Sequence, residues 1–184
     1  MPEFTSYCKA VNSGQFSDLH RHYHNQTYGF PIADDQQLFG RLILEINQAG
    51  LSWDTVLQKK VTIEQAYAQY DIEKIAHFKE KDIERLLANP GIIRMRKKIE
   101  AIIFNAQQIL RLQQSYGSFY AWLNTQHPKT AEEWIKCFKK HFKFTGNEIT
   151  KEFLLSTGYL KGAHEIDCPI YAKTLKAHPK WAEN

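Results

Sequence analysis

The sequence predicts an all-α protein. Apolar residues recur every three to four positions through most of its 184 residues, whereas alternation with a period of two is scarce. Short segments containing Gly and Pro separate these periodic stretches. Hydrophobic residues make up 43% of the chain, which is ample for a buried core. We therefore expect about eight or nine helices, arranged as one domain or as two small lobes sharing a core.

The first clear helix is bounded by its own capping residues. Asp34 or Asp35 can cap it, an apolar stripe runs from Leu38 to Ala49, and Gly50 ends it. Two further helices are expected after it. Ser52 can cap one that begins at Trp53, and Thr62 can cap another that runs to about Tyr70.

The middle of the chain predicts a helix, a tight hairpin and a second helix, over about residues 82–114. Asp82 to Ala88 form a short helical pattern, and Asn89-Pro90-Gly91 must interrupt it. Helical periodicity then runs from Arg96 to about Gln114.

Three more helices are expected beyond Gly117. They lie near Phe119 to Asn124, at Ala131 to His141, and from about Asn147 to Ser156, closed by Gly158. From Gly162 onward the sequence predicts an irregular tail.

Charge and cysteine content limit the class of protein. The net charge is +4 with a pI near 8.8, too weak to indicate nucleic acid unless the cations cluster. They do cluster, at residues 94–98 and in the lysines between residues 136 and 143. Three cysteines leave one unpaired in any disulfide scheme, and the first residues lack the pattern of a signal peptide, so we expect the reducing cytoplasm. No apolar stretch approaches the roughly 18 residues that span a bilayer, so we expect no membrane association.

The hairpin is a candidate contact for phosphates. A helix that starts beside Gly91 would point backbone N–H groups outward, and a phosphate oxygen can accept from them. Basic side chains at Arg94, Arg96, Lys97 and Lys98 would add long-range attraction. The alternative is an ordinary turn between two helices with a solvated basic face.

The two ends of the chain hold a possible Cys₂His₂ metal set: Cys8, His24, His164 and Cys168. Spacing alone cannot distinguish His24 from His20 and His22, which alternate with it. The alternative is that the cysteines are small buried hydrophobic residues.

Glu45 lies about 20° from Leu38 around the first helix, at the edge of the apolar stripe. A half-buried carboxylate there is a candidate for acid–base work or for recognition of a polar ligand, unless it turns to solvent. Aromatic residues crowd this third of the chain, and five stand out: Tyr7, Tyr23, Tyr28, Phe30 and Trp53. Such residues are mostly core, but with Glu45 they could also form a pocket for a nucleobase removed from its stack.

Taken together, these residues resemble the type I 3-methyladenine DNA glycosylases, bacterial helix-hairpin-helix repair enzymes. The likeness extends from about Cys8 to Cys168. Its strongest stretches are Tyr23-His24 with Gly29 and Pro31, Leu44-Glu45 with Gln48-Ala49-Gly50-Leu51-Ser52-Trp53, and Glu84-Arg85-Leu86 leading to Gly91-Ile92-Ile93-Arg94 and Lys98-Ile99-Glu100-Ala101-Ile102-Ile103.

The resemblance implies one glycosylase domain over residues 1–184, of two packed helical lobes. A structural zinc would join the terminal segments, about 8–24 and 164–168, and the resemblance selects His24 as its ligand. Tyr23 and Trp53 would sandwich the flipped base, with Tyr28 beside them, and Glu45 would be the catalytic residue that accepts from the amino edge of the base. The DNA-binding hairpin residues would be Gly91, Ile92, Ile93, Arg94, Arg96, Lys97 and Lys98.

The chain departs from the family pattern at a few positions. Tyr28 stands where the family has Trp, Ala10 replaces another Trp, and Glu148 lies in a segment that usually reads differently. No Asp occurs between Asp82 and Asp167, which argues against the Asp-dependent glycosylase-lyases of the wider superfamily. We therefore expect a monomeric, monofunctional glycosylase acting on alkylated double-stranded DNA in the bacterial cytoplasm. The alternative is a damage-recognition protein of the same fold that has lost its chemistry or changed its substrate.

Overall fold

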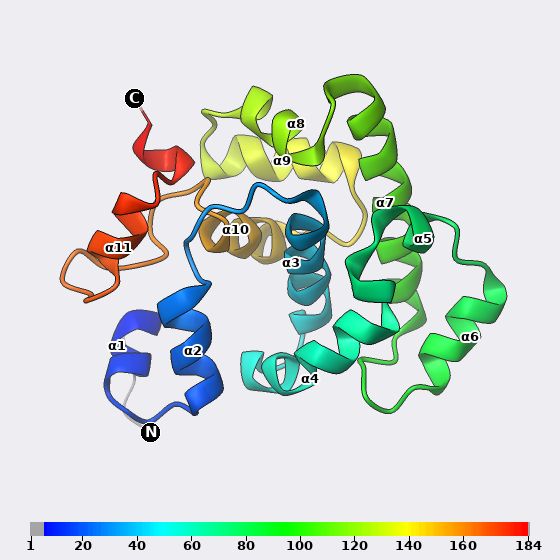
Figure 1. Ribbon diagram of the computed structural model, residues 1–184, viewed down its shortest axis with the longest axis horizontal. Coiled ribbons are helices and arrows are strands. Elements are labelled where there is room, and N and C mark those ends of the chain that lie inside the picture. The colour runs from blue at the N-terminus through cyan, green and yellow to red at the C-terminus, as the bar shows by residue number, and fades with distance from the viewer. Residues whose placement is uncertain (1–5, 184) are drawn as a thin grey trace. The chain divides into compact units, whose positions relative to one another are not determined.

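The computed structural model describes residues 6–183, and every regular element in that range is a helix (Figure 1). This confirms the all-α prediction for the described residues. They form two compact units. The terminal unit comprises the described parts of the two chain ends, 6–31 and 154–183, and the central unit comprises residues 32–153. Within the described range, no helix is long and apolar enough to cross a membrane.

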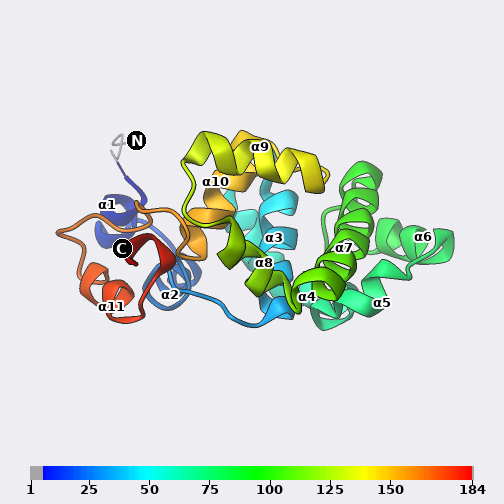
Figure 2. The same ribbon diagram turned by 90° about the horizontal axis from the view of Figure 1, so that it is seen from above.

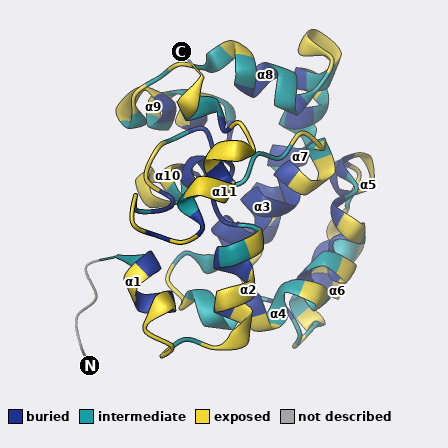
Figure 3. Cartoon of the chain, turned by 60° about the vertical axis from the view of Figure 1, so that its left-hand side comes forward, coloured by how far each residue is buried: buried dark blue, intermediate teal, exposed yellow. Residues whose placement is uncertain are grey.

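Helix α3 (Asp35–Gln48) is the core of the central unit. Its N-cap is Asp34, whose side chain accepts from the Gln37 amide at 2.8 Å. Every residue from Leu38 to Asn47 is buried, so α3 is dark blue along most of its length in Figure 3. It packs against α4 (Trp53–Ala66), α7 (Arg96–Tyr116) and α8 (Phe119–Gln126).

Helix α4 corrects one expectation. Thr62 does not start a new helix but lies inside α4, which continues to Ala66 because nothing in the segment interrupts its backbone hydrogen bonds. The chain then passes through a left-handed turn at residues 68–70, in which Tyr70 has a φ of 62°. The ring of Tyr70 packs directly on Gly40 of α3, in space that any side chain there would fill.

The predicted helix, hairpin and helix are present. Helix α6 (Glu80–Ala88) and the long α7 pack together, and α5 (Ile72–Ala76) lies against α7 as well (Figure 1). Helices α9 (Ala131–His141) and α10 (Asn147–Ser156) have the bounds that the sequence predicts. Figure 2 shows α9 beside α10, and an aromatic cluster joins α8, α9 and α10: Phe119, Trp122, Phe138, Phe142 and Phe153.

The terminal unit contains α1 (Tyr7–Asn12), α2 (Asp18–Gln26), the end of α10 and α11 (Tyr171–Lys176). The irregular tail expected after Gly162 is therefore partly wrong, since α11 and a short 3₁₀ turn, Lys180–Ala182, lie within it. Backbone hydrogen bonds tie the two chain ends together: the Gly29 amide donates to Ser156 O at 2.9 Å. The unit is thus built from segments that are distant in sequence.

Candidate functional site

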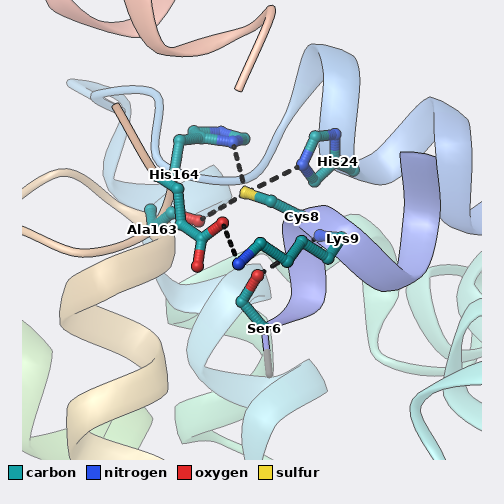
Figure 4. A network of polar contacts seen from close by, with 7 residues as sticks. Ser6, Cys8, Lys9, His24, Ala163 and His164 are labelled. Carbon is teal, nitrogen blue, oxygen red and sulfur yellow. Dashed lines mark hydrogen bonds and ion pairs between the residues drawn. The ribbon is translucent and has the colours of Figure 1, made fainter. Parts of the chain in front are cut away.

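Four buried side chains meet in the terminal unit: Cys8, His24, His164 and Cys168. One nitrogen or sulfur atom from each lies within 4.8 Å of the other three. Cys8 comes from α1 and His24 from α2, whereas His164 and Cys168 come from the loop that precedes α11. Figure 4 shows Cys8 with both imidazoles directed at its sulfur. The structure therefore brings together all four residues of the predicted ligand set, and His20 and His22 are not among them.

The distances fit a tetrahedral metal ion. Cys8 Sγ is 3.3 Å from His24 Nε2 and 3.6 Å from His164 Nδ1. Cys168 Sγ is 3.7 Å from each of the same two nitrogens. A zinc ion with bonds of about 2.3 Å to sulfur and about 2.0 Å to nitrogen would hold its sulfur and nitrogen ligands about 3.5 Å apart. The donor set and its spacing thus fit such an ion.

The outer atoms of both imidazoles fix their orientation. His164 Nε2 lies 2.7 Å from Tyr28 O. Because a carbonyl oxygen can only accept, Nε2 must carry the hydrogen, which leaves the lone pair of Nδ1 facing the sulfurs. His24 Nδ1 lies 2.7 Å from Asn25 Oδ1, so its Nε2 faces the sulfurs in the same way. Partners of this kind are typical of metal-binding histidines.

Burial controls the charge of the cluster. It raises the pKa of the Cys8 thiol to about 12 and lowers the pKa of His164. A neutral imidazole is the form that ligates a metal, and a cation at the centre would stabilise the thiolates.

Gly29 permits the contact between Tyr28 and His164. Its φ is +82°, and a Cβ on it would lie 2.8 Å from Ala163 Cβ and 3.2 Å from the His164 ring. Any other residue would both strain the backbone and push the imidazole away from the cluster.

Glu45 is more deeply buried than its position at the edge of the apolar stripe predicts, with 4% of its surface exposed. Within residues 6–183 its carboxyl group makes no hydrogen bond. Burial raises the pKa of this carboxyl to about 8; Arg41, one turn earlier on α3, lowers it, and Glu152 raises it further. Glu45 is therefore largely protonated at neutral pH in the ligand-free protein.

Trp53 begins the next helix, eight residues after Glu45 in the sequence. Ser52 caps α4 by accepting from the Thr55 amide at 3.2 Å, as the sequence predicts. The cap leaves Trp53 at the first helical position, with its side chain partly exposed. Glu45 and Trp53 thus flank one short connection between two helices of the central unit.

Tyr23 and Tyr28 belong to the terminal unit, and both are buried. Their ring centroids are 5.7 Å apart. The ring of Tyr28 also packs edge-on against Tyr7 and His164. Tyr28 therefore belongs to the shell around the four-residue cluster, through both its ring and its carbonyl.

The hairpin differs in detail from its predicted form. The Gly91 amide is not free, because it donates to Asn89 Oδ1 at 2.9 Å, and the Ile92 amide donates to Asn89 O at 3.4 Å. Among residues 6–183, the amides of Ile93 and Arg94 have no partner. The amides that a phosphate could reach thus lie two residues later than the sequence suggests.

The basic side chains of the hairpin fall into three groups. Arg94 and Lys97 are exposed. Arg96 is also exposed but pairs with Glu80 at 2.8 Å and with Glu100 at 3.6 Å. Lys98 is only 2% exposed and its ammonium donates to two backbone carbonyls, so it does not belong to the basic face predicted for it. The side chain of Ile92 is buried as well.

Several contributing residues were not found from the sequence. Asn25 and Asn89 act through single hydrogen bonds, and neither spacing nor residue type marks them. The burial of Lys98 could have been predicted, because it lies within about 20° of Asn105 and Ile109 around α7, on the buried face.

Comparison with known proteins shows the family of this chain. A family model described as methyladenine glycosylase matches residues 13–136. The DNA-3-methyladenine glycosylase 1 of Escherichia coli is 35% identical, covering 81% of this chain and 89% of its own length. A 3-methyladenine DNA glycosylase I of Staphylococcus aureus superposes with a TM-score of 0.80 at 34% identity, covering 90% of this chain and 97% of the other.

A further solved structure is that of a variant 3-methyladenine DNA glycosylase I in complex with 3-methyladenine. It superposes with a TM-score of 0.79 at 34% identity, covering 88% of this chain and 97% of the other. The similarity therefore extends over nearly the whole length of these relatives. This chain belongs to the methyladenine glycosylase family.

Proposed function

We propose that this protein is a monofunctional DNA glycosylase that hydrolyses the N-glycosidic bond of 3-methyladenine in alkylated double-stranded DNA. The observation that carries the proposal is the buried Glu45 carboxyl, which has no hydrogen-bond partner in the described chain and lies on the helix that leads to Trp53. A buried carboxyl without a partner is costly unless a ligand provides one. Membership of the family supplies the class of ligand.

The reaction needs little acid or base catalysis from the protein's side chains. A 3-methyladenine attached to deoxyribose carries a positive charge and leaves as a neutral base when the bond from its ring nitrogen to C1′ breaks. Water then adds to C1′ and loses a proton, which leaves an abasic site. The protein must extrude the nucleotide and hold its base, at a cost of a few kcal/mol that stacking and hydrogen bonds offset.

Two residues of the central unit would hold the base. Trp53 would stack on it, and Glu45 would accept from its amino edge. The positive charge of the base would also favour the carboxylate form of Glu45 and so lower its raised pKa on binding. In the terminal unit, Tyr23 would be a further stacking residue for the base, and Tyr28, whose ring contacts that of Tyr23, would support it.

The hairpin would hold the DNA backbone. The unpartnered amides of Ile93 and Arg94 could donate to a phosphate, and the exposed side chains of Arg94 and Lys97 would add charge. Gly91 and the buried Ile92 would shape the turn. Arg96 would contribute less, because Glu80 and Glu100 already pair with it.

The Cys₂His₂ cluster would bind one structural zinc ion through Cys8, His24, His164 and Cys168. Four protein ligands leave no open position for a substrate, which favours a structural role over a catalytic one. The ion would hold together the two chain ends of the terminal unit. We further propose that both units work as one glycosylase domain and that the protein acts as a monomer.

Release of free base from methylated duplex DNA, followed by chromatography, tests the proposal. Glu45→Gln keeps the size of the side chain and removes the carboxylate, so it is the matched variant. Release of 3-methyladenine by the wild type and a clear loss in the folded variant would support the glycosylase. Tight binding to methylated or abasic DNA without release would instead favour the non-catalytic recognition protein, an alternative suggested by the departures from the family pattern at Ala10, Tyr28 and Glu148.

A further inference from the structure

The second helix of the hairpin carries a buried lysine. Lys98 lies in the first turn of α7 and is 2% exposed. Its Nζ donates to Asn47 O at 2.8 Å and to Ala49 O at 2.7 Å. It also lies 5.9 Å from the centre of the Phe144 ring. Burial of an ammonium group has an energetic cost and lowers its pKa. The two hydrogen bonds to backbone carbonyls offset part of that cost.

The two carbonyls belong to the end of α3. Gln48 is the last helical residue, and Ala49 leaves the helix with a ψ of 116°. Carbonyls at a helix C-terminus have no partners within the helix, and the helix dipole favours a cation there. The ammonium of Lys98, on α7, donates hydrogen bonds to these carbonyls and also places a positive charge at the C-terminus of α3. It therefore fixes where α3 ends and in which direction the chain leaves it.

Two of the residues proposed to hold the base, Glu45 and Trp53, lie on either side of this contact in the sequence. Glu45 precedes Asn47 by two residues, and Trp53 follows Ala49 by four. Between them, Gln48 Nε2 donates to Leu51 O at 3.1 Å, which further shapes the connection. A shift of the Asn47–Ala49 backbone would thus change the position of Glu45 relative to Trp53.

A second set of contacts joins this region to the hairpin. On α4, Lys59 Nζ donates to Pro90 O at 2.9 Å, and Thr62 packs on Gly91. The hairpin is therefore held by Lys98 against the end of α3 and by Lys59 and Thr62 against α4. All of these residues belong to the central unit.

We propose that Lys98 is a positioning residue, which sets the geometry of Glu45 and Trp53 relative to the hairpin by clamping the carbonyls of Asn47 and Ala49. It touches neither the base nor a phosphate. The proposal rests on the proposed function, since it concerns the same pocket. Its role is to let the hairpin and the base-binding residues form one rigid frame, which catalysis by positioning requires.

Lys98→Met tests the proposal, because Met resembles the apolar stem of the lysine side chain but has no hydrogen-bond donor. Asn105→Leu is the matched control. Asn105 is fully buried on the same face of α7, and its side chain also holds backbone groups, donating to Lys143 O at 3.0 Å and accepting from Lys143 N at 2.8 Å. Both variants lose buried hydrogen bonds to the backbone, but only Lys98 binds the backbone that lies between Glu45 and Trp53 in the sequence. Melting temperature would show that both are folded.

Three readouts separate positioning from stability alone: the kcat for release of base from methylated DNA, the Kd for free 3-methyladenine by calorimetry, and the Kd for abasic duplex DNA. We expect Lys98→Met to lower kcat and to weaken binding of the free base by about tenfold or more, which corresponds to about 1.4 kcal/mol. Binding to abasic DNA should stay within about twofold, since the exposed hairpin residues are unchanged. Asn105→Leu should leave kcat and base binding within about twofold of the wild type.

If Lys98→Met matches Asn105→Leu in kcat and base binding, the proposal is overturned. If Lys98→Met does not fold, Lys98→Gln decides, because its shorter side chain cannot reach both carbonyls. A folded Lys98→Gln with wild-type base binding overturns the proposal, and weakened base binding supports it. If the wild type itself releases no base, the proposed function has failed. If the wild type releases base and the Lys98 variant does so equally well, only the positioning role of Lys98 is refuted.

Discussion

Thr62 of α4 occupies the space that a side chain on Gly91 of the hairpin would need. A Cβ on Gly91 would lie 2.4 Å from Thr62 Cγ2 and 3.1 Å from Asn89 Oδ1. The φ of Gly91 is not in the left-handed region, so a close approach of two elements, rather than backbone freedom, requires glycine here.

Gly91→Ala should therefore lower the free energy of unfolding, by about 1–3 kcal/mol. Thr62→Ser removes the clashing methyl group, so the double variant should recover part of that loss. Urea denaturation of the wild type, both single variants and the double variant gives the coupling energy. If the two substitutions change the free energy of unfolding additively, the side chains at positions 62 and 91 do not contact each other.

The stability of the protein should fall as pH rises, because Glu45 is buried. Its folded pKa is raised to about 8 from an ordinary value of 4.5, so the unfolded chain binds fewer protons between these values. The favourable contribution is complete below pH 4.5 and is lost as pH rises through 8. Relative to Glu45→Gln, the wild type should lose on the order of a few kcal/mol between about pH 5 and 9. Denaturation of both proteins at the two pH values checks this, and parallel curves would contradict it.

Removal of one cluster ligand should release the metal and lower stability. Cys168→Ala should abolish the content of one zinc per chain and cost about 4 kcal/mol, since the ion closes a loop of about 140 residues. Cys137→Ala is the control, because this half-buried cysteine lies on α9 outside the cluster. Metal analysis and thermal unfolding, with and without a chelator, are the measurements. A wild type purified without metal, or a Cys168 variant as stable as the Cys137 variant, would refute the structural zinc.

The exposed cations of the hairpin should contribute unequally to DNA binding. Arg94→Ala and Lys97→Ala should each weaken binding at all sequences and reduce the slope of log affinity against log salt by about 1. Arg96→Ala should have a smaller effect because Glu80 and Glu100 already neutralise that charge. Fluorescence anisotropy over a salt series compares the three. An Arg96 effect as large as that of Lys97 would mean that the ion pairs open when DNA binds.

The sequence predicted well those elements whose ends carry their own chemical signals. Helix α9 has the predicted bounds because Thr130 and Glu133 form a capping box at its start. Helices α1, α2, α5 and α11 were missed. All except α2 have only five or six residues, which are too few for a clear period, and tertiary packing stabilises them. The prediction that a new helix begins at Thr62 was wrong, because a residue that can cap a helix can equally lie within one.

The residues of the candidate site were predicted about as well as the fold. The four cluster residues were found because their residue types restrict the chemistry, although only the family resemblance selected His24. The extent to which Glu45 is buried could not be predicted from the sequence. The angular position of Glu45 on its helix shows which way the side chain points, but not which other residues pack against it. The burial of Lys98 was missed because its neighbours Arg96 and Lys97 are cationic and exposed, and composition alone groups the three together.

The Cys₂His₂ cluster also sets an order of events during synthesis. Cys8 and His24 leave the ribosome long before His164 and Cys168, and the central unit lies wholly between them. That unit is continuous in sequence, so it can fold while the last ligands are still being made. The terminal unit can be completed only afterwards, when both chain ends are present. Until then Cys8 must remain a reduced thiol without its final partners, so capture of the metal would mark the end of folding rather than its beginning.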